Sequence, residues 1–160
     1  MLVRKGNMSL VFKTRLLLAF AFTVISFHSF AEITVSNAKV RLLPPGVPNT
    51  SAYFTIKNTG SVDRYLVSAS ADFAKSAELH AHIMEGEMMR MQQQEQIVIP
   101  AGESVTFKPG GLHVMIFGLK QSLTENQSVS FTVNTKDQQS IVINAKVVMP
   151  GDEGNHHHHH

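Results

Sequence analysis

Short segments rich in Val, Ile, Thr and Phe recur through most of this 160-residue chain, and Gly, Pro, Asn and Asp interrupt them at close intervals. Such segments are typical of β-strands, and many strands at short spacing favour a sandwich or a barrel. We therefore predict an all-β domain of the size of one Greek-key sandwich or barrel. The predicted strands are residues 33–43, 51–58, 65–69, 77–84, 87–93, 104–108, 113–119, 129–134 and 140–148.

The N-terminal region has a different composition. Residues 1–15 contain four basic and no acidic side chains, residues 16–27 are mostly apolar, and Ser29–Ala31 has a small-x-small pattern. This combination is typical of a cleavable signal peptide over residues 1–31, with Met1 or Met8 as initiator. The apolar run is shorter than the roughly 20 residues of a membrane-spanning helix, although an N-terminal anchor is the alternative. We expect export to the periplasm and a mature domain over residues 32–148.

Charge and cysteine content exclude several classes of function. Residues 32–160 contain 10 Lys and Arg against 12 Asp and Glu, so the net charge is near −2 with His neutral. No basic patch alternates with aromatic residues, and we predict no nucleic-acid partner. The chain has no Cys, which excludes disulfides, thiol redox chemistry and a blue-copper thiolate site.

Histidine and methionine gather in the middle of the chain. Five of the eight Met residues and three of the four His residues outside the C-terminal tract lie within residues 80–115. A single Met is usually core filler and a single His is usually a surface residue. Two imidazoles and two thioethers together form a ligand set that favours Cu(I). The candidate Cu(I) ligands are His80, Met91, His113 and Met115.

Strand geometry predicts how these side chains meet. A two-residue loop at Glu85–Gly86 would pair His80 with Met91 across a hairpin. His113 and Met115 are two residues apart, so they point to the same face of their strand. The site would then consist of one His-Met pair facing a second.

Other residues of the same hairpin allow more than one role. His82 and Met89 share the ligand face, and they are candidates for an accessory pair, an alternative ligand pair or a docking surface. Ile83 and Met88 lie on the opposite face, where we expect them to fill the core.

Residues 149–160 are predicted to form a flexible His-rich tail. A turn-rich linker leads to His156, His157, His158, His159 and His160. The five His residues are either a purification tag or a native metal-binding tract, and the still-attached signal peptide favours the native tract. We expect this tract to be an accessory site, with Cu(II) as its ion.

The spacing of these residues resembles the copper-binding motif of the periplasmic PCu(A)C copper chaperones. Glu78–His80 is followed by ten residues and Met91, and then by twenty-one residues and His113–Met115. The resemblance covers about residues 33–148. It extends to Arg41–Gly46, Ser51–Phe54, Asn58–Gly60, Ile99–Gly102 and Phe107–Leu112.

This resemblance implies a cupredoxin-like Greek-key barrel or sandwich with a solvent-accessible Cu(I) site made of the four candidate ligands. It also implies a chaperone, not an enzyme, with no small-molecule substrate. The implied partners are periplasmic copper donors or receivers, such as a cytochrome oxidase subunit or another assembly factor of the Cu(A) or Cu(B) centre. A copper buffer or resistance protein without a dedicated client is the alternative. An oxidative copper enzyme would need cleavage after Phe27 to expose His28 as an N-terminal ligand.

Overall fold

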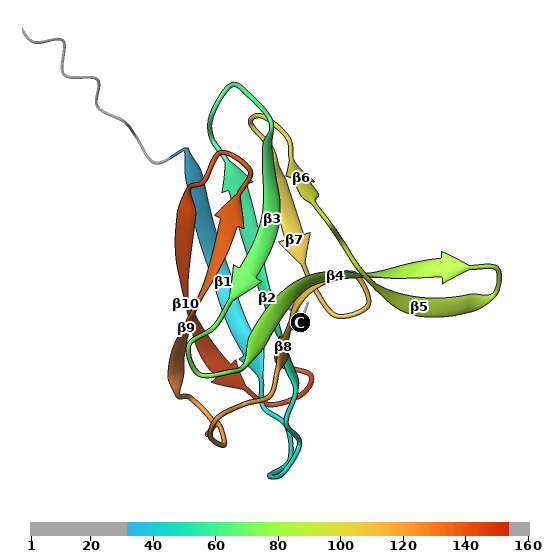
Figure 1. Ribbon diagram of the computed structural model, residues 1–160, viewed down its shortest axis with the longest axis vertical. Coiled ribbons are helices and arrows are strands. Elements are labelled where there is room, and N and C mark those ends of the chain that lie inside the picture. The colour runs from blue at the N-terminus through green and yellow to red at the C-terminus, as the bar shows by residue number, and fades with distance from the viewer. Residues whose placement is uncertain (1–31, 154–160) are drawn as a thin grey trace, which may run out of the picture. The chain divides into compact units, whose positions relative to one another are not determined.

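Ten strands follow one another between residues 32 and 153, the part of the chain that the computed structural model describes (Figure 1). The predicted signal peptide and the five C-terminal His residues lie outside these residues. The strands are β1 (Ile33–Arg41), β2 (Thr50–Asn58), β3 (Arg64–Ser70), β4 (Ser76–Glu85), β5 (Met88–Gln93), β6 (Ile97–Ile99), β7 (Ser104–Phe107), β8 (Leu112–Phe117), β9 (Ser128–Thr135) and β10 (Ser140–Val148).

The strands close into a barrel. Their order is β5-β4-β8-β2-β1-β10-β9-β3-β6, and β7 pairs with β2. An additional pairing of β3 with β4, at Ala69 and Ala77, closes a ring of seven strands. Strand β5 lies outside this ring and extends the sheet from β4 (Figure 1). Neighbours in the ring are antiparallel except β1 and β10, which are parallel.

The interior is filled by apolar side chains that alternate along the strands, as expected for a period of two residues. Phe54 of β2 stacks on Phe107 with ring centroids 4.3 Å apart, and it meets Phe131 at 5.7 Å. All three rings are almost fully buried. Leu79 of β4 and Val114 of β8 contribute to the same core. The residues next to Leu79 and Val114 in the sequence point outward, and the core therefore fixes the strands that carry them.

The all-β prediction is confirmed. Each of the nine predicted strands is present, with its ends displaced by at most two residues. Strand β6 was not predicted, because three residues before Pro100 are too short to show a strand period.

The predicted register of the β4–β5 hairpin is wrong. The loop consists of Gly86 and Glu87, so His80 pairs with Gln93, and Met91 pairs with His82. Gly86 has φ +64° and occupies the first position of the loop, where a type II′ turn requires positive φ. The predicted loop would have placed Glu85 there. The pairing is shifted by two residues, and a shift of two leaves every side chain on its predicted face.

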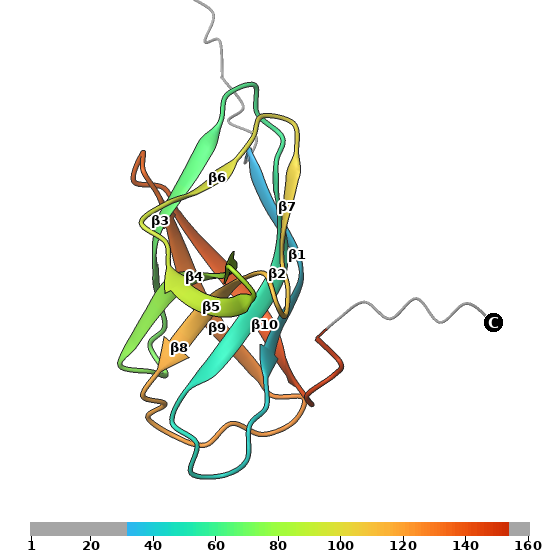
Figure 2. The same ribbon diagram turned by 90° about the vertical axis from the view of Figure 1, so that its right-hand side faces the viewer.

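The outer half of this hairpin extends away from the barrel, as Figure 1 shows, and Figure 2 views the barrel from that side. Ile83 and Met88 are therefore exposed, by 38% and 59%. The expectation that they fill the core is wrong, because no second layer from residues 32–153 covers this part of β4 and β5.

The first residues of the predicted tail, 149–153, lie against β1. The Lys39 ammonium group donates a hydrogen bond to the carbonyl oxygen of Asp152 at 2.6 Å, and Arg41 forms an ion pair with Glu153. Glu153 is buried. Burial opposes its ionisation, but hydrogen bonds from the backbone and from Arg41 hold the pKa of this carboxyl below its usual value. Residues 149–153 are thus anchored to the domain. None of residues 32–153 belongs to a helix long and apolar enough to cross a membrane.

Candidate metal centre

Three of the four candidate ligands, His80, His113 and Met115, lie on the outer face of β4 and β8, and Met91 lies on the neighbouring β5. His80 and His113 are directly opposite each other in this strand pair. Two residues away on the same face, Glu78 is opposite Met115. The residues between them, Leu79 and Val114, point into the core. Alternation along two paired strands therefore gathers a polar and sulfur-containing row on the outer face.

His113 has one nitrogen fixed and the other free for a ligand role. Its Nδ1–H donates a hydrogen bond to the carbonyl oxygen of Gly111 at 3.0 Å, because a carbonyl can only accept. Its Nε2 lies 3.2 Å from the sulfur of Met91. Burial lowers the pKa of His113, and the nearby His82, His80 and Arg41 lower it further, which outweighs the hydrogen bond to Gly111. The ring is therefore neutral at pH 7, and an Nε2 lone pair faces the thioether.

In His80, too, one ring nitrogen is hydrogen-bonded and the other has no partner, but here Nε2 is the bonded nitrogen. Its Nε2–H donates to the carboxylate of Glu78 at 2.9 Å. Its buried Nδ1 has no hydrogen-bond partner among residues 32–153. The rings of His80 and His113 are 5.9 Å apart between centroids. Histidines that ligate metals usually donate their other N–H to a carboxylate or a carbonyl, as these two do.

Met115 lies one residue pair away from these rings. It is directly opposite both Glu78 of β4 and Ser51 of β2. The hydroxyl of Ser51 donates a hydrogen bond to the Met115 sulfur at 3.1 Å. Its side chain shares the face of His113, as predicted, while its sulfur is held on Ser51. The structure thus groups His80, Met91 and His113 by contact and places Met115 beside them.

The two accessory candidates of the hairpin differ in position. The ring of His82 is 5.0 Å from that of His113, closer than the ring of His80, so His82 belongs to the cluster. Met89 is directly opposite Met84 on the outer half of the hairpin and is 59% exposed. It lies outside the contact cluster around His113. The five C-terminal His residues lie outside the described part of the chain.

Several neighbours of the cluster were not singled out from the sequence. Glu78 orients His80, Ser51 binds Met115, and Tyr53 packs its ring 6.5 Å from that of His113, with the Arg41 guanidinium over it at 5.5 Å. Glu78 could have been found, because it lies two residues before His80 and a strand has a period of two. Ser51 and Tyr53 could not, since their place depends on the pairing of β2 with β8.

The donor atoms of this cluster differ from those of metal sites built from His, Asp and Glu alone. Within residues 32–153, no three His, Asp or Glu side chains form a group that could hold a metal ion. The cluster around His113 joins imidazoles to thioether sulfur. Imidazole suits several transition metals, and thioether selects Cu(I) among them.

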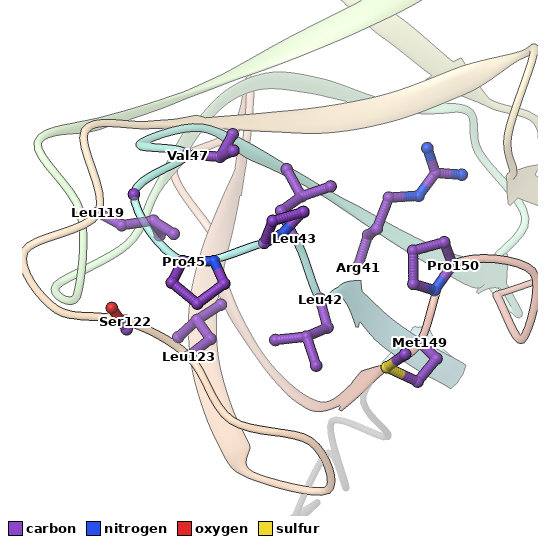
Figure 3. A pocket seen from close by; sticks show the side chains of 12 residues that line it. Arg41, Leu42, Leu43, Pro45, Val47, Leu119, Ser122, Leu123, Met149 and Pro150 are labelled. Carbon is purple, nitrogen blue, oxygen red and sulfur yellow. The ribbon is translucent and has the colours of Figure 1, made fainter.

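A separate hollow lies at one end of the barrel (Figure 3). Its volume is about 360 Å³, and apolar side chains such as Leu42, Val47, Leu123 and Met149 line it. None of the candidate metal ligands lines this hollow.

Comparison with known proteins identifies one family and several relatives of this domain. Residues 33–147 match the family described as putative lipoprotein LpqE-like. A putative lipoprotein of Leifsonia xyli subsp. xyli is 35% identical over 106 residues, which cover 66% of this chain and 63% of that relative. The chain thus spans less than two thirds of that relative's length.

Solved structures show the same fold. The Cu(I)-bound form of DR1885 from Deinococcus radiodurans is 28% identical, with a TM-score of 0.61 over 78% of this chain and 83% of that one. The copper-bound PCuAC domain of PmoF2 is 18% identical, with a TM-score of 0.64 over 77% and 97%. The cupredoxin-like architecture expected from the sequence is therefore confirmed.

Proposed function

This chain belongs to the LpqE-like family and has a PCuAC-type copper-chaperone domain, and we propose that it is an exported carrier of Cu(I). The ion is its cargo. His80, Met91, His113 and Met115 are the proposed ligands, and the proposed receivers are the copper centres of respiratory oxidases or the factors that assemble them. The protein performs no catalytic step in this role.

The observation that carries the proposal is the approach of Met91 to His113. Two electron-pair donors, Sδ and Nε2, lie 3.2 Å apart, and the other nitrogen of His113 is already bonded to Gly111. Metal–nitrogen and metal–sulfur bonds of about 2.0 and 2.3 Å, as at tetrahedral zinc, place two such donors about 3.5 Å apart. The pair therefore needs little movement to hold one ion.

The remaining two ligands need only local changes. His80 presents an unpartnered Nδ1 on the same face, and its orientation is held by Glu78. Met115 must exchange its hydrogen bond from Ser51 for the ion. Met has three rotatable bonds in its side chain, so this exchange requires no backbone movement.

Exposure of the site suits a carrier better than a permanent metal centre. Met91 is 47% exposed on the hairpin, whereas His113 is almost fully buried. A partner can therefore displace the thioether of Met91 first, while the imidazoles still hold the ion. The thioether ligands carry no charge, so displacing Met91 leaves no charge without a partner.

The ligand assignment is tested by Cu(I) competition titration of the mature protein and its variants. We expect Met91→Leu and His113→Ala to weaken the tightest Cu(I) equivalent strongly, because each removes a donor atom. Met88→Leu is the matched control, since Met88 lies on the opposite face of the same hairpin. Unchanged affinity in the first two variants would refute the assignment.

The client is tested in cells. A deletion strain with an oxidase defect that added copper rescues would support delivery to the oxidase. Copper sensitivity with normal oxidase activity would support the alternative, a copper buffer without a dedicated client. Export is tested by N-terminal sequencing of the protein from the periplasmic fraction. Although the family description includes lipoproteins, this sequence has no Cys that a lipid could modify.

A further inference from the structure

The β4–β5 hairpin exposes an unusual number of thioethers. Met84, Met88, Met89 and Met91 are exposed by 62%, 59%, 59% and 47%. Methionine is normally among the residues most often found in the interior. Four exposed Met side chains on one short hairpin therefore require an explanation other than core packing.

Three of these four side chains share one face of the hairpin. Met84 is directly opposite Met89, and the next pair on that face is His82 with Met91. Cβ atoms of directly opposed residues are about 4.5–5.5 Å apart, within reach of long side chains. The two sulfurs of Met84 and Met89 can therefore meet over the hairpin.

The opposite face of the hairpin has a different character. Met88 and Ile83 lie there with Glu85 and Arg90, which form an ion pair at 3.0 Å. On the face that carries His82–Met91 and Met84–Met89, no residue of the paired part of the hairpin is charged, and the nearest charged residue of that face is Glu78, further along β4. The two outer pairs, His82–Met91 and Met84–Met89, offer only imidazole and thioether donors, which suit a soft monovalent ion.

We propose that Met84 and Met89, with His82 as third donor, form a second Cu(I) site on the outer half of the hairpin. This inference rests on the proposed function, because it takes the same ion as the cargo of the inner cluster. The buried Nδ1 of His82 has no hydrogen-bond partner among residues 32–153, so the ring has an uncommitted nitrogen. Two thioethers and one imidazole at an exposed position bind more weakly than the inner set.

The position of this outer site gives it a role in copper entry and exit. Successive residue pairs on one face of a strand are separated by about 6.7 Å, twice the rise per residue. One such step leads from Met84–Met89 to His82–Met91, and Met91 already touches His113 of the inner cluster. An ion that first binds the hairpin thus reaches the inner ligands by exchange of one donor at a time.

Methyl NMR of the mature full-length protein, labelled with ¹³C at the Met methyl groups, tests this site residue by residue. Anaerobic titration with Cu(I) is expected to shift Met91 and Met115 first. Excess Cu(I) is then expected to shift Met84 and Met89 together and to leave Met88 unchanged. Met88 has the same exposure as Met89 and differs from it in the face on which it lies. Signals of Met84 and Met89 that stay unchanged, or a Met88 signal that moves with them, would overturn the outer site.

The same titration separates failure of the two proposals. If Met84 and Met89 respond and Met91 and Met115 do not, the inner assignment fails and the outer site stands. If only Met91 and Met115 respond, the proposed function stands and the outer site fails.

Kinetics tests the role of the outer site. We expect the double variant Met84→Leu, Met89→Leu to take up Cu(I) from a chelator several-fold more slowly, with the equilibrium affinity of the inner site unchanged. Met88→Leu is the control and should behave as the unaltered protein. A loss of inner-site affinity in the double variant would show that these residues are ligands of the inner site, and would overturn the two-site proposal. An unchanged uptake rate would overturn the role in entry.

Discussion

The sulfur of Met91 lies 3.2 Å from Nε2 of His113, although β4 separates the strands that carry them. The Met91 side chain therefore reaches across β4 and brings a donor from β5 to one on β8. Both His113 and His80 have their second nitrogen bonded to an oxygen of the protein. If the two histidines bind the proposed ion, much of the cost of orienting them is thus met by folding, before any ion binds.

The Glu78 carboxylate is predicted to contribute to copper affinity without touching the ion. Glu78→Gln weakens the hydrogen bond that fixes the His80 ring, and loss of such a partner typically costs 10- to 100-fold, to order of magnitude, in metal affinity. Competition titration with a Cu(I) chelator measures the change. Glu125→Gln, which neutralises an exposed carboxylate on the loop between β8 and β9, is the control. Equal affinities of the two variants would contradict the orienting role.

The turn at Gly86 is predicted to control the position of Met91. Gly86 has φ +64°, and a Cβ atom added to it would meet no other atom within 4 Å, so Gly86→Ala adds backbone strain without a clash. We expect a cost of about 1–3 kcal/mol, as for a non-Gly residue held in a sparsely populated backbone region. Hydrogen exchange should show faster opening of the hairpin, and Cu(I) affinity should fall.

A second glycine provides the control for that experiment. Gly102, on the loop between β6 and β7, has φ +74° and equally open surroundings. Gly102→Ala should cause similar strain and leave Cu(I) affinity unchanged. A similar loss of affinity in both variants would indicate a global effect on stability and contradict the role of the turn.

The ion pair between Arg41 and Glu153 is predicted to give the stability of the domain a dependence on pH. The pKa of Glu153 is lowered in the folded protein, so the unfolded chain takes up a proton first as the pH falls. The contribution is fully present above the unfolded value of about 4.3 and is lost as the pH falls through the lower folded value. Glu153→Gln should therefore lower the free energy of unfolding at pH 7 by about 1–3 kcal/mol.

Urea denaturation at pH 7 and at about pH 3 measures this effect, because the difference between the two proteins should shrink at the lower pH. Asp152→Asn is the matched control, since it neutralises an exposed neighbouring carboxylate. A difference that is the same at both pH values would show that packing, and not the charge of Glu153, accounts for it.

The C-terminal His tract is predicted to bind Cu(II) independently of the inner cluster. Imidazole suits Cu(II), whereas the thioethers of the inner cluster favour Cu(I). Replacing residues 156–160 by Ser keeps the length of the chain and removes the imidazoles. Titration should then show loss of Cu(II) binding with unchanged Cu(I) affinity. Loss of the tight Cu(I) site in this variant would mean that the tract supplies ligands to it.

The fold and the face of the candidate site could be predicted from the sequence, because both follow from the period of two residues along a strand. His80, Met91 and His113 come together as expected, even though His80 is opposite Gln93 and Met91 is opposite His82. An error of two residues in the register leaves the face unchanged. Turn chemistry set the true register: Gly86 is the first residue of the loop, and a Gly in that position favours the type II′ turn.

What could not be predicted depends on contacts between strands distant in the sequence. The hydrogen bond of Ser51 to Met115 requires the pairing of β2 with β8. The closeness of His82 to His113 requires the pairing of β4 with β8 in the observed register. Exposure of Met88 follows from the length of the hairpin beyond the closed ring, which a local pattern of residues does not reveal.

The alternation of candidate ligands and core residues on β4 and β8 restricts which insertions and deletions these strands tolerate. Leu79 and Val114 support the barrel from within, while their neighbours His80 and His113 face outward. A deletion of one residue exchanges the two sets, and only displacements by two preserve both. Insertions or deletions that shift either strand by an even number of residues are therefore the ones that keep the histidines and the core residues on their present faces.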